Sequence, residues 1–222
     1  MDGDSVLFSL RLSFQVALGA TALVVLVGTP LAYLLAMRQF RGKDLLDILL
    51  TLPLVLPPTV TGYYLIVLFG RKGAIGAIVY QVTGFSIMFT WYAAVLASFV
   101  VALPLMIKAS RAAIEAVDKN LINASYTLGH GALETAVRVI LPLGRRGIIA
   151  GAVLSFARAL GEFGATLMVA GNIPGRTDTM PIAIYSKVGS GDWSKAHLMV
   201  IIFTVLSGLV LYTSNRLSKR IF

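Results

Sequence analysis

Stretches of mostly apolar residues, each long enough to cross a lipid bilayer as a helix, recur along this chain. About 20 apolar residues span the hydrocarbon core, where every backbone N–H and C=O must be bonded within its own segment. Only 13% of the residues are charged, against 57% that are hydrophobic, which is too little charge for a soluble domain of this length. The sequence therefore predicts an all-α, multi-pass membrane protein.

We expect five spans within one transmembrane domain over residues 1–222. The predicted spans cover residues 12–37, 45–69, 85–107, 148–170 and 196–215. The main connections between them are a glycine-rich loop at 70–84, a polar loop at 108–147 and a second polar loop at 171–195.

Lys and Arg residues are about twice as frequent on the side that carries residues 108–147 and the C-terminus as on the other side. The positive-inside rule then places this side in the cytoplasm and the N-terminus outside. The net charge of +9 comes mostly from loops that flank the spans, where anionic lipid accounts for it, so no nucleic-acid partner is expected. The two halves show no inverted repeat of hydropathy, which argues against a secondary transporter built from repeats.

Two opposite charges lie inside the fourth predicted span. Arg158 and Glu162 are four residues apart, so on a continuous helix they share a face and can pair. A charge at the bilayer centre costs about 2.5–3.5 kcal/mol, so both side chains are expected to face protein or water. They either line or brace a polar path at a subunit interface, or they form a purely structural ion pair.

The second predicted span is interrupted by prolines. Such breaks are tolerated in a membrane only where protein or a water-filled cavity surrounds them. A static proline kink is one interpretation, and part of a gate is the other. The full set of pathway or gate candidates is Pro57, Pro58, Thr59, Thr61, Arg158, Glu162 and Thr166.

No catalytic constellation is present in the sequence. The segment Gly70–Gly73 lacks the spacing of a phosphate-binding loop, so this chain is not expected to hydrolyse ATP or to be an enzyme. There is no cysteine, and His130 and His197 have no second ligand at metal-binding spacing, so neither a metal nor a bound cofactor is expected.

The polar loop at 108–147 has the pattern of two short helices around a glycine turn. Asp118 is a good N-cap for the first helix, and Gly129 provides its stop. A second helix is expected over residues 132–140, ended by Pro142. Held outside the bilayer, this pair would form a knob that another protein can grip.

The loop resembles the cytoplasmic coupling loop of ABC importer permeases. The matching positions are Asn123, Ala124, Ser125, Gly129, Val139, Leu141 and Pro142. Asn123 stands where the family often has Glu, and it carries no charge for a salt bridge to the ATPase. The resemblance implies an ATPase-docking surface that includes Asp118, Asn123, Ala124, Ser125, Leu128, Gly129, Leu141 and Pro142.

Further segments are similar to the branch of this family that carries molybdate and related oxyanions. They are Leu56–Val60 with Gly62, Gly70–Gly73 with Ile75 and Gly76, Ala157–Arg158 with Gly161–Thr166, and Gly171–Thr177. Sulfate permeases share a similar pattern in the fourth span. Molybdate, tungstate, and sulfate or thiosulfate therefore stay open as substrates, with molybdate preferred.

The resemblance implies a type I ABC importer permease in the cytoplasmic (inner) membrane of a bacterium or archaeon. Two copies would form a homodimer with the pathway between them, and a pair of ATPase subunits, binding ATP and Mg, would grip the coupling loops. A separate extracytoplasmic protein would deliver the anion, with the 171–195 loop as its docking surface. The anion would cross unmodified by alternating access.

Two rival functions belong to other classes. An ATP-independent channel or carrier would need acidic or polar stripes in several spans, whereas Glu162 is the only acid well inside one. The other rival is a membrane assembly or anchoring protein that transports nothing. Co-purification with an ATPase would separate both from an importer permease.

Overall fold

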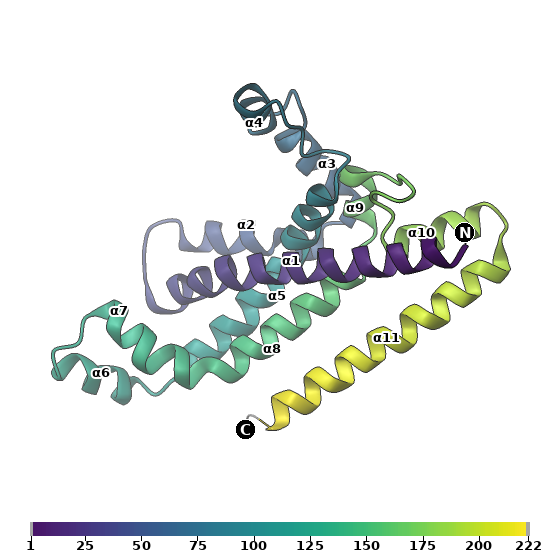
Figure 1. The fold of residues 1–222 in the computed structure, drawn as a ribbon. Coiled ribbons are helices and arrows are strands. Elements are labelled where there is room, and N and C mark those ends of the chain that lie inside the picture. The colour runs from purple at the N-terminus through teal and green to yellow at the C-terminus, as the bar shows by residue number, and fades with distance from the viewer. Residues whose placement is uncertain (1, 221–222) are drawn as a thin grey trace.

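The computed structural model describes residues 2–220, apart from the side chains of residues 2–4, 214–215 and 217–220. Every regular element in this part of the chain is helical (Figure 1). The elements are α1 (Asp2–Met37), α2 (Lys43–Val55), α3 (Pro58–Phe69), α4 (Gly76–Thr83), α5 (Trp91–Glu115), α6 (Lys119–Thr127), α7 (Ala132–Thr135), the π-helical turn η1 (Ala136–Ile140), α8 (Leu141–Leu160), α9 (Gly164–Ala170), α10 (Met180–Gly189) and α11 (Trp193–Arg220).

Long apolar helices dominate the structure, as a multi-pass membrane protein requires. Within the described residues, 4 helices are long and apolar enough to cross a membrane, namely Ser5–Met37, Trp91–Glu115, Ala132–Leu160 and Trp193–Thr213. The multi-pass class is thus confirmed. The number of five spans and their orientation stay predictions.

The second predicted span, 45–69, is two helices and not one. Leu56 and Pro57 separate α2 from α3 with extended backbone, at ψ 142 and 136. Pro57 and Pro58 cause this, because a proline disfavours helical conformation in the residue before it and provides no N–H for a helical bond. Pro53, by contrast, lies inside α2.

The fourth predicted span, 148–170, was wrong as a continuous helix. Its helix begins earlier, at Leu141, and ends at Leu160. Residues 161–163 are non-helical, and the short helix α9 follows. Gly161 lies in this break and Gly164 follows it, and helix formation costs glycine about 1 kcal/mol more than alanine.

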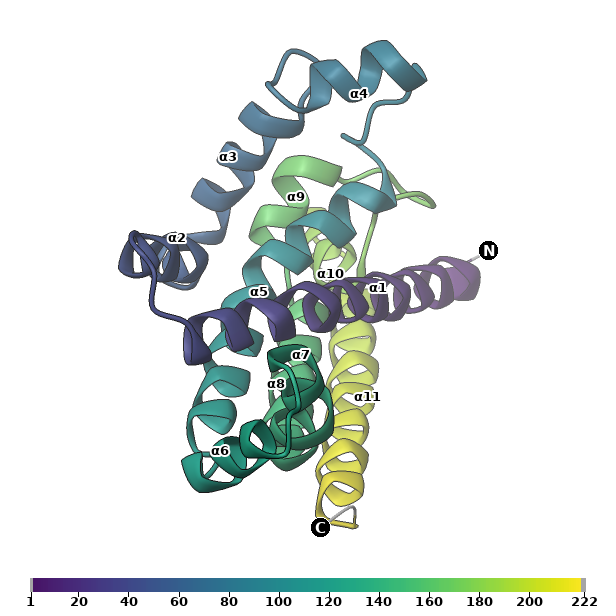
Figure 2. The same ribbon diagram turned by 90° about the vertical axis from the view of Figure 1, so that its left-hand side faces the viewer.

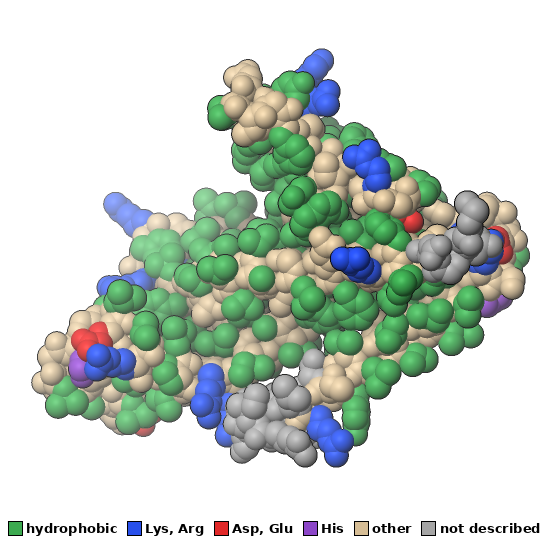
Figure 3. Space-filling view, viewed as in Figure 1, with side chains coloured by type: hydrophobic (Ala, Val, Ile, Leu, Met, Phe, Trp, Pro, Cys, Tyr) green, Lys and Arg blue, Asp and Glu red, His purple; other side chains and the backbone are tan. Residues whose placement is uncertain are grey.

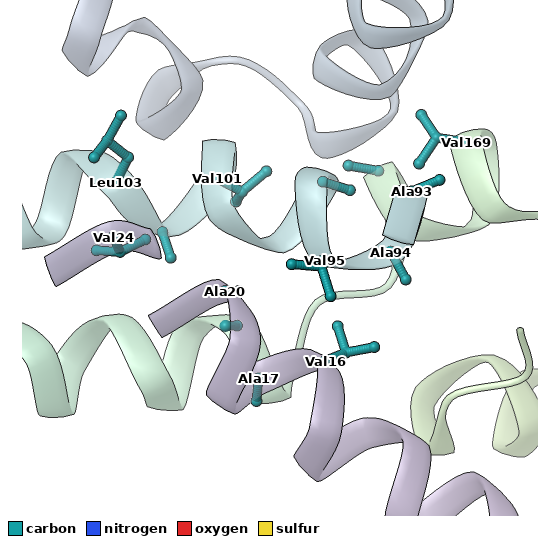
Figure 4. Close-up of a cluster of buried hydrophobic side chains, with 14 of the residues drawn as sticks. Val16, Ala17, Ala20, Val24, Ala93, Ala94, Val95, Val101, Leu103 and Val169 are labelled. Carbon is teal, nitrogen blue, oxygen red and sulfur yellow. The ribbon is translucent and has the colours of Figure 1, made fainter. Parts of the chain in front are cut away.

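Small residues bring α1 and α5 together at the centre of the molecule. Figure 4 shows valines and alanines of α1 facing alanines and valines of α5, with Val169 of α9 nearby. Close approach of this kind is typical of membrane helices. Gly28 is required here, because a Cβ on it would lie 2.9 Å from the Cγ of Met106.

The predicted loops are shorter than expected. The 70–84 loop contains α4, which stands away from the body beyond α3 in Figures 1 and 2. The 171–195 loop contains α10 and the start of α11. The 108–147 loop shrinks to residues 116–131, which include α6, because α5 continues to Glu115 and the helical path that leads into α8 begins at Ala132. We call the end with α6 and α7 the loop end, and the end with α10 the opposite end.

Candidate functional site

The helix α6 begins and ends as its sequence indicates. The Asp118 carboxylate accepts a hydrogen bond from the N–H of Asn120 at 2.8 Å, which confirms the N-cap. At the other end Gly129 has φ 87, a left-handed conformation in which glycine avoids the steric cost of a Cβ. The His130 N–H reaches back to the carbonyl of Ser125 at 3.2 Å, so the helix closes there.

A small apolar core holds α6 in place. Ile122 of α6 packs in one cluster with Ile114 of α5, Val117 just after α5, Ile140 of η1 and Ala32 of α1. The buried hydroxyls of Ser125 and Thr135 hydrogen-bond at 2.9 Å, which joins α6 to the end of α7. These contacts connect α6 to α1, α5, α7 and η1, so it is positioned to move with them as one body.

The opposite face of α6 and the turn that follows are open to solvent. Asn123 and Ala124 are exposed, and Leu128 and Leu133 are 78% and 79% exposed. Figure 3 shows His, acidic and basic side chains gathered at this end. The Nδ1 of His130 lies 3.0 Å from the Oε2 of Glu134, and the Nη2 of Arg138 lies 3.2 Å from its Oε1. Exposed apolar groups beside a charged rim are typical of protein-binding surfaces.

Asn123 also lines a cleft beneath α6. The cleft has a volume of about 530 Å³ and lies between α6 and the ends of α1 and α5, where Met37 and Glu115 contribute to its walls. Asn123, which stands where the family often has Glu, therefore lies between the exposed knob and the membrane helices.

The prediction that Pro142 ends the second loop helix was wrong. From α7 through η1 into α8 the helical path is unbroken, with Pro142 in the first turn of α8. A π-helical turn directly before it bonds i to i+5, which accommodates a residue that has no N–H to donate. Leu141 and Pro142 therefore lie on a long rod that continues from the knob into the apolar body.

Arg158 and Glu162 do form an ion pair, although Glu162 lies beyond the helix end. The Arg158 Nη2 is 2.7 Å from the Glu162 Oε2. Glu162 is only 3% exposed. Its Oε1 accepts a hydrogen bond from the N–H of Ala165 at 2.8 Å. One carboxylate thus neutralises the arginine and caps the first turn of α9, which fixes the 161–163 break.

The two helix breaks lie side by side. A Cβ on Gly164 would be 3.0 Å from the Cβ of Pro58, and a Cβ on Gly62 would be 2.7 Å from the Cβ of Met168. Glycines therefore let α3 and α9 pack closely just where each helix is interrupted. The sequence-based reasoning missed this pairing, although the glycines after each break were a signal for it.

The remaining pathway candidates divide by exposure. Thr61 and Thr166 are 4% and 1% exposed, and within the described part of the chain their hydroxyls have no hydrogen-bond partner. Pro57 and Thr59 are exposed on the outside of the α2–α3 break. The structure thus brings Pro58, Glu162 and their neighbours to one region, and leaves Pro57 and Thr59 on its surface.

A polar cluster at the opposite end was also missed. The Asp178 carboxylate accepts hydrogen bonds from the Ser9 hydroxyl at 3.2 Å and the Gly175 N–H at 2.9 Å. Ser13 accepts the N–H of Met180 at 2.7 Å. Burial raises the pKa of Asp178 above its ordinary value. The cluster fastens the 171–179 connection to α1. Serines four residues apart on an apolar helix were the available signal.

Among the residues that the structure describes, no three His, Cys, Asp or Glu side chains gather closely enough to hold a metal ion.

Relatives of known name cover almost the whole chain. The molybdenum transport system permease protein ModB of Escherichia coli K12 is 44% identical, over 97% of this chain and 93% of its own. The putative molybdenum transport system permease protein YvgM of Bacillus subtilis is 42% identical, over 90% and 88%. ModB of Azotobacter vinelandii is 37% identical, over 95% and 94%.

Solved structures share the fold at low sequence identity. A chain of the inward-facing MetNI methionine ABC transporter has a TM-score of 0.75 at 15% identity, covering 96% of this chain and 94% of that one. A chain of a bacterial ABC transporter that imports alginate has a TM-score of 0.71 at 16% identity, covering 95% and 79%. The family described as "binding-protein-dependent transport system inner membrane component" matches residues 28–222. With this match and these full-length relatives, the chain belongs to that family of ABC importer membrane subunits.

Proposed function

We propose that this chain is the permease subunit of an ATP-driven importer of molybdate. The observation that carries the proposal is the identity of 44% to a molybdenum transport permease over more than nine-tenths of both chains. Molybdenum is available in water as the tetrahedral molybdate anion, which a membrane does not pass unaided. The shared fold with chains of ABC importers supports the same assignment.

The permease acts with partners that supply energy and substrate. Two copies enclose the pathway, a pair of ATPase subunits with ATP and Mg binds at the loop end, and a separate binding protein delivers the anion at the opposite end. The exposed knob of α6, Leu128 and Leu133 supports the ATPase contact. The membrane is the inner membrane of a bacterium, in keeping with the bacterial relatives.

Movement at the loop end reaches the pathway through packed elements. Closure of the ATPase pair displaces α6, which shares an apolar core with α1, α5 and η1. The breaks at 56–57 and 161–163 give α3 and α9 room to tilt while they stay packed on one another through glycines. A packed interface that switches between two arrangements would convert this small shift into opening.

The ion pair in the pathway region favours passage over capture. Because Glu162 neutralises Arg158 at 2.7 Å, an oxyanion meets no isolated positive charge there. An unpaired arginine in a low-dielectric site would bind the anion tightly and slow its release. We therefore assign this pair to bracing the break.

Reconstitution tests the function directly. The permease is assembled in proteoliposomes with its ATPase and its oxyanion-binding protein, and ATP hydrolysis and uptake are measured with molybdate, tungstate, sulfate and thiosulfate. Molybdate is expected to stimulate hydrolysis and to accumulate inside only when ATP is present. Stimulation by sulfate alone would reassign the substrate, and uptake without the ATPase would refute an ATP-driven importer.

A further inference from the structure

The helix α2 is attached to the rest of the molecule at few points. It has no buried residue, and only Leu46 and Leu50 pack partly against the main core. Between them lies Asp47, an acid in an otherwise apolar run. Its carboxylate accepts a hydrogen bond from the Nη1 of Arg111 in α5 at 2.8 Å. The side chain of Arg111 is 24% exposed and that of Asp47 is 25% exposed.

Arg111 connects in turn to the loop end. Its Nε donates to the Glu115 Oε1 at 2.7 Å, and Glu115 is the last residue of α5. Glu115 lines the same cleft as Asn123 of α6. Two residues further along the chain, Val117 joins the apolar core that seats α6. The packing of Ile122 on residues 114–117, followed by the ion pairs of Arg111 with Glu115 and Asp47, therefore connects α6 to α2.

The other end of α2 leads to the 56–57 break. Beyond this break α3 is packed on α9 through the Gly62 and Gly164 contacts. Thus α2 is an arm between two attachments, with Arg111 near one end and the proline break at the other. Arg111 is well suited to attach α2, because its planar guanidinium binds the carboxylates of Asp47 and Glu115 at the same time in fixed directions.

We propose that Arg111 is a positioning residue that fastens α2 to α5 and α6, so that displacement of α6 is passed to the proline break. This deepens the proposed function and rests on it for its transport consequence. Without the Asp47–Arg111 contact, α6 still moves α5, but α2 no longer follows. ATP is then hydrolysed with less anion moved.

The first test measures molybdate transported per ATP hydrolysed in the full reconstituted complex. Arg111→Gln is expected to lower this ratio by about two- to thirtyfold, the range found for residues that carry coupling between sites. Lys108→Gln is the matched control. The Nζ of Lys108 lies near the same Asp47 carboxylate, but at 3.7 Å, and its side chain is 53% exposed. The ratio of transport to hydrolysis in Lys108→Gln should therefore change less than twofold. An unchanged ratio in Arg111→Gln overturns the proposal.

A rescue experiment separates attachment from folding. The chain has no cysteine, so Asp47→Cys with Arg111→Cys introduces the only two thiols of the permease chain. The ratio should be low in this variant and should recover when a short bifunctional thiol reagent joins the two positions. A linked complex that hydrolyses ATP and still fails to transport would overturn the proposal, because the two helices would then need to separate.

A second measurement does not depend on the substrate. Spin labels at Leu49→Cys of α2 and Leu121→Cys of α6, both exposed, report the distance between these helices in lipid nanodiscs. The distribution should be narrow with Arg111 and should broaden with Arg111→Gln. If no oxyanion is transported by the unmodified complex, the proposed function fails, and this distribution still decides the inference. An equally narrow distribution in the variant refutes it.

Discussion

Gly129 is the residue on which the shape of the knob most depends. Its φ of 87 is costly for any residue with a Cβ, yet open space surrounds it, so a substitution is resisted by backbone conformation alone. Gly129→Val should lower the free energy of unfolding by about 1–2 kcal/mol, because a residue with a Cβ is strained in the left-handed conformation. It should also reduce ATP-driven uptake. Thermal unfolding and uptake of the complex measure the two effects.

Gly129→Asn provides the control for this change. Asparagine visits the left-handed region more readily than other residues with a side chain, so its stability and uptake should stay close to those of the unmodified protein. Full uptake by Gly129→Val would contradict a rigid role for the turn.

The Arg158–Glu162 pair should behave as one unit in stability measurements. Glu162→Gln leaves an amide oxygen to accept the Ala165 N–H but leaves Arg158 unpaired, and breaking a buried pair costs about 3–5 kcal/mol. Because Arg158 is 30% exposed, we expect the low end of this range. The double variant Arg158→Gln, Glu162→Gln should lose less than the sum of the single losses. Additive losses in a thermal double-mutant cycle would disprove the coupling.

Asp178 makes stability depend on pH. Burial raises its pKa above 3.8, so the folded state binds the proton more tightly than the unfolded state. The resulting stabilisation is complete below pH 3.8 and is lost as the pH rises through the higher folded pKa. Asp178→Asn should flatten this part of the stability curve, as measured by chemical denaturation across acidic pH. An unaltered slope would show that other groups cause it.

At the scale of elements, the contact between α3 and α9 sets how far the two breaks can separate. A methyl group on Gly62 would approach Met168 and the backbone of Ala165, so Gly62→Ala should destabilise the protein by about 1–3 kcal/mol, as overpacking does. It should also slow uptake. Gly208→Ala is the control, because that glycine has open space around it and the helix itself favours alanine. Equal melting temperatures for the two variants would rule out the tight contact.

Sequence patterns predicted elements well where the chemistry is local. Asp118 and Gly129 mark α6 because a cap and a left-handed turn act within a few residues, and Pro57 and Pro58 break their span for the same reason. Pro142 misled, because a π turn before it keeps the helix intact. The break at 161–163 was missed because Glu162, four residues after Arg158, also suits a continuous helix.

At the scale of the whole molecule, the sequence predicted the membrane class and the family but not the contacts between distant segments. Apolar length and helix breaks are written along the chain, whereas the meeting of Pro58 with Gly164, or of Asp47 with Arg111, depends on how helices cross. Such crossings follow from small residues whose partners cannot be read from one sequence. The pathway candidates could therefore be named, but only the structure shows which of them lie together.

The orientation of the molecule decides whether an importer is possible at all. The excess of Lys and Arg predicts that the loop end faces the cytoplasm, where an ATPase must bind. The absence of native cysteine allows single thiols at Leu128 on the knob and at Tyr185 on α10, both exposed at 78% and 57%. A membrane-impermeant maleimide added to spheroplasts should label Tyr185→Cys at once, and Leu128→Cys only after the membrane is opened.

The same two variants report whether the knob is where the ATPase binds. In opened membranes, an added ATPase should slow labelling of Leu128→Cys, because Leu128 belongs to the exposed apolar surface that a partner would cover. Labelling of Tyr185→Cys should not change, since α10 lies at the opposite end (Figure 1). Labelling of Leu128→Cys in intact spheroplasts would show that the loop end faces outward. The predicted orientation would then be wrong, and cytoplasmic ATP hydrolysis could not act on α6.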